Sequence, residues 1–216
     1  EAGIPVIGHA RIPEHFARFE APRLAAVQAA PATEPDKAWE AVRLTAPTVL
    51  VPAGTDTHLV LGGRAIELVP LAPGHTDTDL AVHVPDARAW MLGDVIEQSG
   101  APTFGSGSFP LGWGASLEAL LTRIGPDDVL VPGHGAAVGR AFAADQAALL
   151  SEVAALIRTA HAADPTSANA GDAAAARSLT DRVDSVVLPT ALSALWPDWM
   201  LRSALRAGFA QLDRPG

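Results

Sequence analysis

The sequence predicts an α+β fold, in which a run of short strands is followed by a run of helices. Five short segments within residues 48–94 are rich in Val, Leu and Ile and are separated by Gly, Pro and Asp, as strands and turns are. After residue 115, leucines and alanines recur at helical spacing. Strands and helices that are segregated along a chain are typical of α+β domains.

Composition indicates a folded domain with a substantial core. The chain has 216 residues, of which 49% are hydrophobic and 18% are charged, a balance typical of globular proteins. The formal net charge is −9 and no basic stripe is present, so we expect no nucleic-acid partner. No apolar run approaches the ~20 residues that a membrane-spanning helix needs, so we expect no membrane partner. Cysteine is absent, which excludes disulfides and thiol catalysis. The cellular compartment, cytoplasmic or secreted, and the oligomeric state stay open.

The first 47 residues predict little regular structure. We expect a short buried strand at Ile4–Ile7, a helical turn at 12–19, and then a short helix and a loose Pro-rich loop within 20–47. Trp39 in that loop belongs either to a packed core or to a lid. A loop of this length is often functional or mobile.

The strand region is punctuated by recognisable turns. Strands are predicted within 48–54, 57–63, 65–71, 79–85 and 88–94. Gly62-Gly63 fits a two-residue hairpin turn, and residues 85–88 form a second turn. Along residues 80–84, Leu80, Val82 and Val84 alternate with Ala81 and His83, and this pattern predicts a half-exposed antiparallel strand.

Helices dominate the remainder of the chain. A Gly/Ser/Pro loop at 99–114 leads into an amphipathic helix at 116–124, for which Gly125 is the expected C-cap. Further predictions are a strand within 128–135, a helix at 140–162, a linker at 163–171, and helices at 172–184 and 198–212, the last capped by Asp198. We divide the chain into a main domain, 1–162, and a helical extension packed on it, 163–216.

Three polar residues share one sequence context. His75, Asp94 and His134 each come just after a β-rich run and beside a glycine. Because side chains at strand ends can converge on one edge of a sheet, and small neighbours leave room for an ion, we expect these three side chains to meet. Two imidazoles and a carboxylate suit Zn²⁺. The sequence therefore predicts a zinc site.

The segments "GHTDTD", "LGD" and "VPGHG", in this order, resemble the C-terminal motifs of the metallo-β-lactamase superfamily. The resemblance covers about residues 2–160. It implies an αββα sandwich, here with extra C-terminal helices, and a mononuclear or dinuclear zinc site at one edge. It also implies a hydrolase in which metal-activated water attacks a small-molecule substrate: an ester, thioester, lactone or β-lactam.

The same resemblance implies a role for each motif residue. His75 resembles the third histidine of the first metal site, and His134 the last histidine, on the second metal. Asp94 resembles the aspartate that bridges two metals and holds the nucleophile, which makes it the catalytic candidate. Thr76, Asp77, Thr78 and Asp79 either support the imidazoles or cap the turn and the next strand.

One motif of the family is missing from this sequence. No His-x-His-x-Asp-His string is present, although "GIPVIGH" resembles the segment that usually follows it. We interpret the sequence as N-terminally truncated, with that motif upstream of Glu1; the alternative is that the family's metal centre has been lost. For this chain we expect weak metal binding and little or no hydrolysis. A non-catalytic metal-binding protein and an iron-dependent oxidoreductase using the same pocket are the other hypotheses.

Aromatic residues of the 99–114 loop are the candidates for substrate contact. Trp113 and Phe109, with Phe104, form either an apolar substrate wall or part of the core. Among the other histidines, we expect His9 to be a structural residue at a strand end. His58, His83 and His161 are expected to be exposed or half-exposed.

Overall fold

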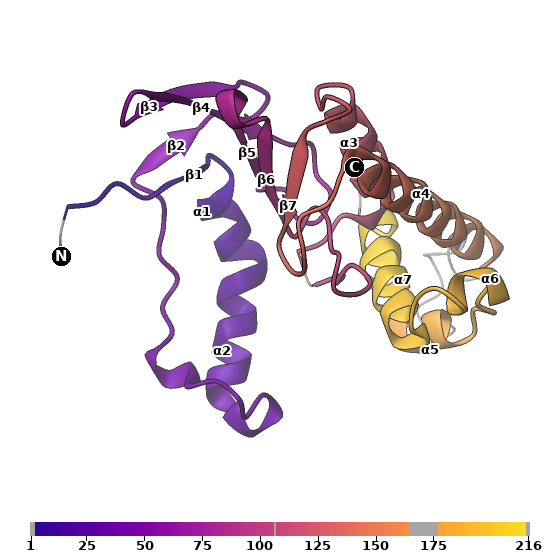
Figure 1. The fold of residues 1–216 in the computed structure, drawn as a ribbon. Coiled ribbons are helices and arrows are strands. Elements are labelled where there is room, and N and C mark those ends of the chain that lie inside the picture. The colour runs from indigo at the N-terminus through magenta and orange to yellow at the C-terminus, as the bar shows by residue number, and fades with distance from the viewer. Residues whose placement is uncertain (1–2, 106, 165–176, 215–216) are drawn as a thin grey trace.

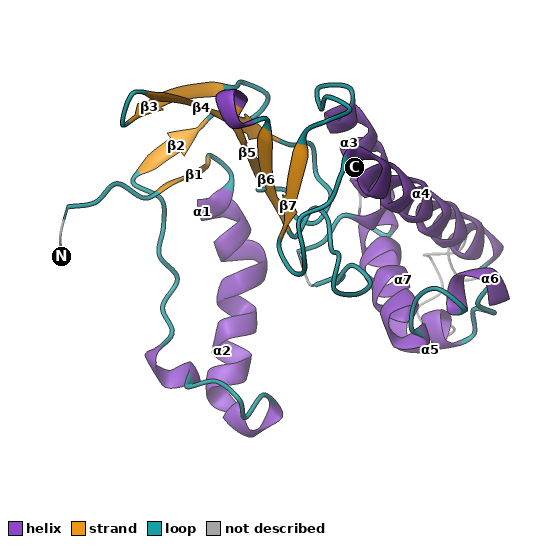
Figure 2. Ribbon diagram, in the orientation of Figure 1, coloured by secondary structure: helices purple, strands orange, loops and turns teal. Residues whose placement is uncertain are grey.

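A computed structural model describes residues 3–105, 107–164 and 177–214. It contains two β-sheets with helices on either side of them, as Figures 1 and 2 show. This arrangement confirms the predicted α+β class. Most of the predicted linker at 163–171 and the first part of the helix predicted at 172–184 lie outside the described residues.

The N-terminal region forms a small sheet and a helical arm. β1 (Ile7–His9) pairs in parallel with β2 (Val49–Val51). Between them α1 (Ile12–His15), a π-helical segment (Phe16–Glu20) and α2 (Ala21–Ala29) form one rod that extends away from the sheets (Figure 1). Two single 3₁₀ turns, Pro31–Thr33 and Trp39–Ala41, follow.

The strand predicted at Ile4–Ile7 was placed wrongly. It begins only at Ile7, and Ile4 is 75% exposed because no described element covers it. Pairing with β2, not burial of Ile4, defines this strand. Trp39, in contrast, is buried, and its indole N–H donates to the Glu34 carbonyl, which favours packing over a lid.

A second sheet has five strands in the order β3-β4-β5-β6-β7. They are β3 (Thr57–Leu61), β4 (Arg64–Pro70), β5 (Leu80–Val84), β6 (Ala89–Gly93) and β7 (Val129–Pro132). Both Gly62 and Gly63 have positive φ, as the predicted hairpin turn requires. A 3₁₀ turn, Pro85–Ala87, links β5 to β6.

Strand direction brings several strand ends to one edge. β5 is antiparallel to both β4 and β6, and β7 is parallel to β6. β4, β6 and β7 therefore run the same way, and the residues that follow each of them leave the sheet at the same edge. The predicted convergence of strand-end residues has its topological basis here.

The helices pack on the five-stranded sheet. They are α3 (Pro110–Leu121), α4 (Arg140–Ala163), α5 (Leu179–Asp184), α6 (Thr190–Ser193) and α7 (Asp198–Leu212). Buried residues from the sheet, α3, α4 and α7 belong to one core, which includes Trp90, Leu117, Leu130, Leu150, Ile157 and Phe209. The C-terminal helices thus share the core of the main domain. Among the described helices, none is both long and apolar enough to cross a membrane.

Several predicted helix ends differ from the structure. α5 begins at Leu179, and residues 177–178, which the prediction placed in the helix, are not helical. α3 begins at Pro110, six residues before its predicted start, because proline fits the first turn of a helix. It ends at Leu121 and is not capped by Gly125, whose N–H binds the Asp128 carboxylate instead. In α7, Asp198 is the first helical residue and Pro197 holds the cap position.

Candidate metal centre

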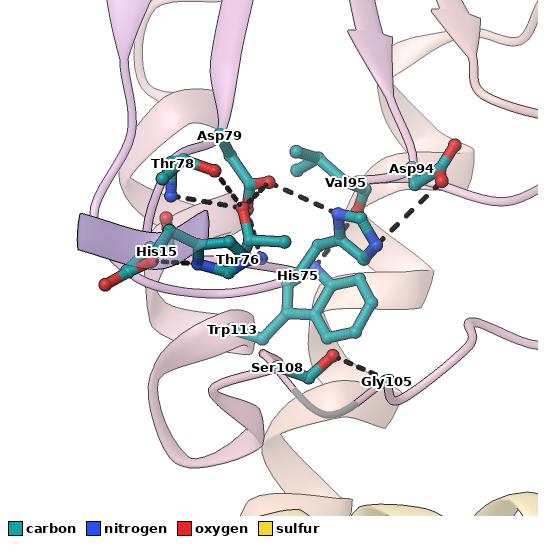
Figure 3. Close-up of polar contacts among 12 residues, drawn as sticks. His15, His75, Thr76, Thr78, Asp79, Asp94, Val95, Gly105, Ser108 and Trp113 are labelled. Atoms are coloured by element: carbon teal, nitrogen blue, oxygen red, sulfur yellow. Dashed lines mark hydrogen bonds and ion pairs between the residues drawn. The ribbon is translucent and has the colours of Figure 1, made fainter. Parts of the chain in front are cut away.

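The three strand-end residues predicted to meet do lie together. Nε2 of His75, in the loop between β4 and β5, is 3.9 Å from Oδ2 of Asp94, which follows β6 (Figure 3). Nδ1 of His134, which follows β7, is 3.7 Å from Oδ1 of Asp94. The aspartate thus stands between the two imidazoles, with one carboxylate oxygen toward each. That these residues bind a metal stays a prediction.

Two glycines shape the backbone around Asp94. Gly93 has a φ of 57°, and the β6–β7 register shifts between Met91 and Gly93, which is a β-bulge of the kind that redirects a side chain. Gly133 lies against the aspartate, because a Cβ built there would collide with Oδ1 of Asp94. Position 133 therefore needs glycine if Asp94 is to keep this orientation.

Glu97 is a site residue that the sequence did not reveal. It is 7% exposed, and its carboxylate oxygens lie 2.8 and 3.1 Å from Nδ1 of His134. Ligand atoms of Asp94, Glu97 and His134 all lie within 4.8 Å of one another, which makes a compact group able to hold a cation. His75 stands outside this group and contacts it through Asp94. The only sequence signal was an acidic residue three positions after Asp94.

A hydrogen-bond network fixes the His75 ring. Nδ1 of His75 lies 3.2 Å from Oδ1 of Asp79, which also accepts from the Thr76 hydroxyl at 2.6 Å (Figure 3). The other carboxylate oxygen of Asp79 accepts the Thr76 N–H at 2.8 Å. Asp79 therefore both supports the imidazole and caps the turn, the two roles between which the sequence left a choice.

The nearby carboxylates favour the protonated form of both histidines. Burial by itself lowers the pKa of His75, but the hydrogen bond to Asp79 and the charges of Asp79, Asp94 and Glu97 outweigh it, so that the net pKa is raised. For His134 the hydrogen bond to Glu97 is the main cause of a raised pKa. The negative charge at this edge therefore favours protonation of the two imidazoles.

These donors fit zinc. Imidazole nitrogens and carboxylate oxygens are its usual ligands, together with Cys sulfur, and a carboxylate hydrogen-bonded to a ligand histidine is the usual support. His134 is 64% exposed and Asp94 is 42% exposed, so both can be reached from solvent. Of the residues present, His75, Asp94, Glu97 and His134 would hold the ion.

The remaining histidines have partners of their own. His15 is buried with Nδ1 2.5 Å from Oδ1 of Asp77, so that Asp77 supports His15 and not His75. His9 is buried at the end of β1, as expected for a structural residue, and its burial lowers its pKa. His58 is exposed, whereas His83 and His161 are half-exposed, as predicted. His83 stacks on Trp90, with ring centroids 3.9 Å apart.

Trp113 and Phe109 occupy different positions relative to the site. Trp113 is fully buried beneath His75, with ring centroids 5.5 Å apart, and its N–H donates to the Val95 carbonyl (Figure 3). It therefore supports the His75 ring from the core side, as does Phe104 through an edge contact with Trp113. Phe109 is half-buried and makes an edge contact with Phe19 of the helical arm, with centroids 6.2 Å apart. A substrate contact by Phe109 stays a prediction.

Comparisons with known proteins match this fold. No family model matches the chain. Metallo-β-lactamase type 2 from Bacillus cereus is 27% identical over 81 residues, which cover 37% of this chain and 32% of that protein. A double mutant of the sec-alkyl sulfatase PisA1 is similar with a TM-score of 0.63 at 18% identity, over 96% of this chain and 36% of that one. The stereoselective sec-alkylsulfatase from Pseudomonas sp. gives 0.53 at 19% identity, over 78% and 27%.

The shared fold and the order of His75, Asp94 and His134 along the strand ends agree with the resemblance seen in the sequence. The chain therefore shares its fold with the two sulfatase structures, and one segment of it is similar in sequence to a metallo-β-lactamase. The names of these similar proteins are those of hydrolases, a lactamase and a sulfatase. The chain spans about a third of the length of these two relatives.

Proposed function

We propose that the chain carries part of the metal centre of a zinc-dependent hydrolase that cleaves a small ester, thioester, lactone or β-lactam. The position of Asp94 is the observation that carries this proposal. Its two carboxylate oxygens face His75 on one side and His134 on the other, at 3.9 and 3.7 Å. A carboxylate placed between two imidazoles suits an ion on either side.

Each residue of the site has a distinct task in this proposal. Zinc, when bound, supplies Lewis acidity and an activated water. Asp94 holds the reacting groups at the edge of the sheet. Asp79 keeps the imidazole of His75 in place through a hydrogen bond to Nδ1. Glu97 lies beside Nδ1 of His134 and would be a further ligand of the ion. The exposure of His134 leaves one side of the centre open to a substrate.

The substrate class is proposed from the relatives. The names of the B. cereus and sulfatase relatives specify a β-lactam and a secondary alkyl sulfate. Both substrates are cleaved by attack on an electrophilic centre that bears a leaving group. For this chain we extend the proposal to small esters of the same kind.

Zinc binding is the first test. Calorimetric titration of the metal-free chain with Zn²⁺ is expected to show about one bound ion per chain, because four donors are available. We expect this binding to be weak. Asp94→Asn is expected to weaken binding at least tenfold, as the loss of a ligand does. Asp127→Asn is the matched control, because Asp127 is 76% exposed and, within the described part of the chain, its ion pair is with the exposed Arg88. Equal zinc affinity for Asp94→Asn and the unmodified chain would overturn the proposal.

Hydrolysis is the second test. p-Nitrophenyl acetate and a chromogenic cephalosporin represent two of the proposed substrate classes, the esters and the β-lactams. p-Nitrophenyl sulfate represents the sulfate esters named for the similar sulfatase. We expect low turnover that requires zinc and disappears in Asp94→Asn. Turnover that survives both a chelator and this substitution would contradict a role for the site.

A further inference from the structure

A pocket lies next to Glu97, on the side of helix α4. It has a volume of about 260 Å³ and is bounded by the loop after β6, by α4 and by Trp196. Phe142 and Leu149 of α4 provide further apolar wall, and Trp196 is only 7% exposed. Ligand pockets are typically apolar clefts of at least a few hundred Å³ with a few polar groups, so this one suits a small molecule.

Gln146 supplies a buried hydrogen-bond donor in the wall of this pocket. Its side chain is 5% exposed, and Oε1 accepts the Glu97 N–H at 3.1 Å. This bond fixes which amide atom is oxygen, since only the oxygen can accept. Nε2 is then left as a donor with no partner among the described residues. Buried donors are rarely left without an acceptor, so this one points to a group that is bound there.

The charges around the pocket restrict what that group can be. Glu97 and Asp145 line it, and no lysine or arginine is among its described lining residues. A carboxylate, phosphate or sulfate ligand would meet like charge on both sides. A neutral or cationic ligand would not, and a cation would be attracted by Asp145, which is exposed at the rim.

We propose that this pocket is an accessory binding site for a small neutral or cationic molecule with an apolar group and a carbonyl oxygen. The apolar group packs against Phe142, Leu149 and Trp196. The carbonyl accepts from Nε2 of Gln146, and a cationic end faces Asp145. Glu97 is the one candidate metal ligand among the described lining residues of this pocket. The proposed binding there therefore does not require zinc.

Three related compounds test this proposal on the metal-free chain in the presence of a chelator. Phenylalaninamide has an aromatic ring, a carbonyl and an ammonium group. Phenethylamine lacks the carbonyl. N-Acetylphenylalanine has a neutral acetamide in place of the ammonium and a carboxylate in place of the carboxamide. In calorimetric titrations we expect phenylalaninamide to bind saturably, about tenfold more tightly than phenethylamine, and N-acetylphenylalanine to bind least.

Gln146→Met removes the donor while retaining much of the side-chain volume. The tenfold preference for phenylalaninamide over phenethylamine is expected to vanish in this variant. Gln211→Met is the matched control, because Gln211 also has a buried amide atom without a partner in the described chain but does not line this pocket. Its ligand preference should equal that of the unmodified chain.

Two results would overturn the proposal. One is that the unmodified chain binds the three compounds equally, or binds none of them saturably. Either observation would mean that Nε2 of Gln146 is hydrogen-bonded to water alone. The other is a preference that persists in Gln146→Met. The comparison of compounds on the unmodified chain stands even if Gln146→Met does not fold. Zinc binding is measured separately, so failure here and failure of the proposed hydrolase are distinguishable.

Discussion

Asp79 and Asp94 contact opposite nitrogens of His75: Asp79 lies 3.2 Å from Nδ1, and Asp94 lies 3.9 Å from Nε2 (Figure 3). When Nδ1–H donates to Asp79, the neutral ring carries its lone pair on Nε2, on the side of Asp94. Asp79 thus orients His75 so that Nε2, the nitrogen that would bind the proposed metal, faces Asp94.

Asp79→Asn is predicted to weaken zinc binding by about tenfold. The neutral amide is a poorer acceptor for the His75 N–H, while its oxygen can still bind the Thr76 backbone. Asp86→Asn is the control, since Asp86 is an exposed residue paired with Arg64. The measurement is the zinc affinity of both variants by titration, with circular dichroism as a check that each variant is folded. An unchanged zinc affinity would show that the Asp79 contact has no bearing on the site.

Gly133→Ala is predicted to disrupt the site while leaving most of the core intact. The added methyl group would collide with Oδ1 of Asp94 and force the carboxylate away from His134. Gly139→Ala is the matched control, because a Cβ there meets nothing within 4 Å. We expect at least a tenfold loss of zinc affinity for Gly133→Ala only. Equal affinity of the two variants would argue against the present position of Asp94.

The edge at which the site forms could be predicted from the sequence, because β-rich runs end directly before His75, Asp94 and His134. Strand direction then decides whether such ends meet, and here β4, β6 and β7 run the same way. The sequence did not reveal Glu97, since its burial depends on packing against α4, far along the chain.

The start of α3 was missed for a related reason. Glycines and prolines at 105–114 favour a loop by local propensity, yet Trp113 buries its whole ring in the core and holds this segment in the helix. Tertiary packing outweighs propensity at this position. The same burial places Trp113 beneath the site, which no local pattern could indicate.

Arg182 is predicted to hold the C-terminal helices together. Its guanidinium lies 2.6 Å from Asp164 at the end of α4 and 2.7 Å from Asp213 after α7, and it stacks on Phe209. Arg182 and Asp164 are 10% and 6% exposed. Arg182→Met keeps an apolar stem but removes the cation, which for a buried pair costs about 3 kcal/mol. Urea denaturation is expected to show this loss, whereas Arg177→Met, in which an exposed arginine is changed, should cost little. A loss below ~1 kcal/mol would place Arg182 among ordinary surface ion pairs.

Asp213 is predicted to make stability depend on pH in acid. The hydrogen bond from Arg182, aided by His161 and opposed by burial, holds the pKa of Asp213 below its usual value. A group whose pKa is lowered by folding stabilises the folded state above its unfolded pKa, about 3.9 for Asp, and loses this contribution as pH falls through the folded value. Because Asp213 is 37% exposed, the contribution at neutral pH is expected to be no more than about 1 kcal/mol.

The measurement is the free energy of unfolding of the unmodified chain and of Asp213→Asn, at pH values from 7 to 3. The difference between them should be constant above pH 5 and shrink as pH falls below 4, because the protonated carboxyl and the amide are then equally neutral. Asp184→Asn, which changes an exposed aspartate at the end of α5, should show no such trend. The difference in unfolding free energy between the unmodified chain and Asp213→Asn could instead stay constant down to pH 3. That result would mean that the charge of Asp213 does not stabilise the C-terminal helices, and that the hydrogen bonds of Asp213 to Arg182 and His161 do not depend on this charge.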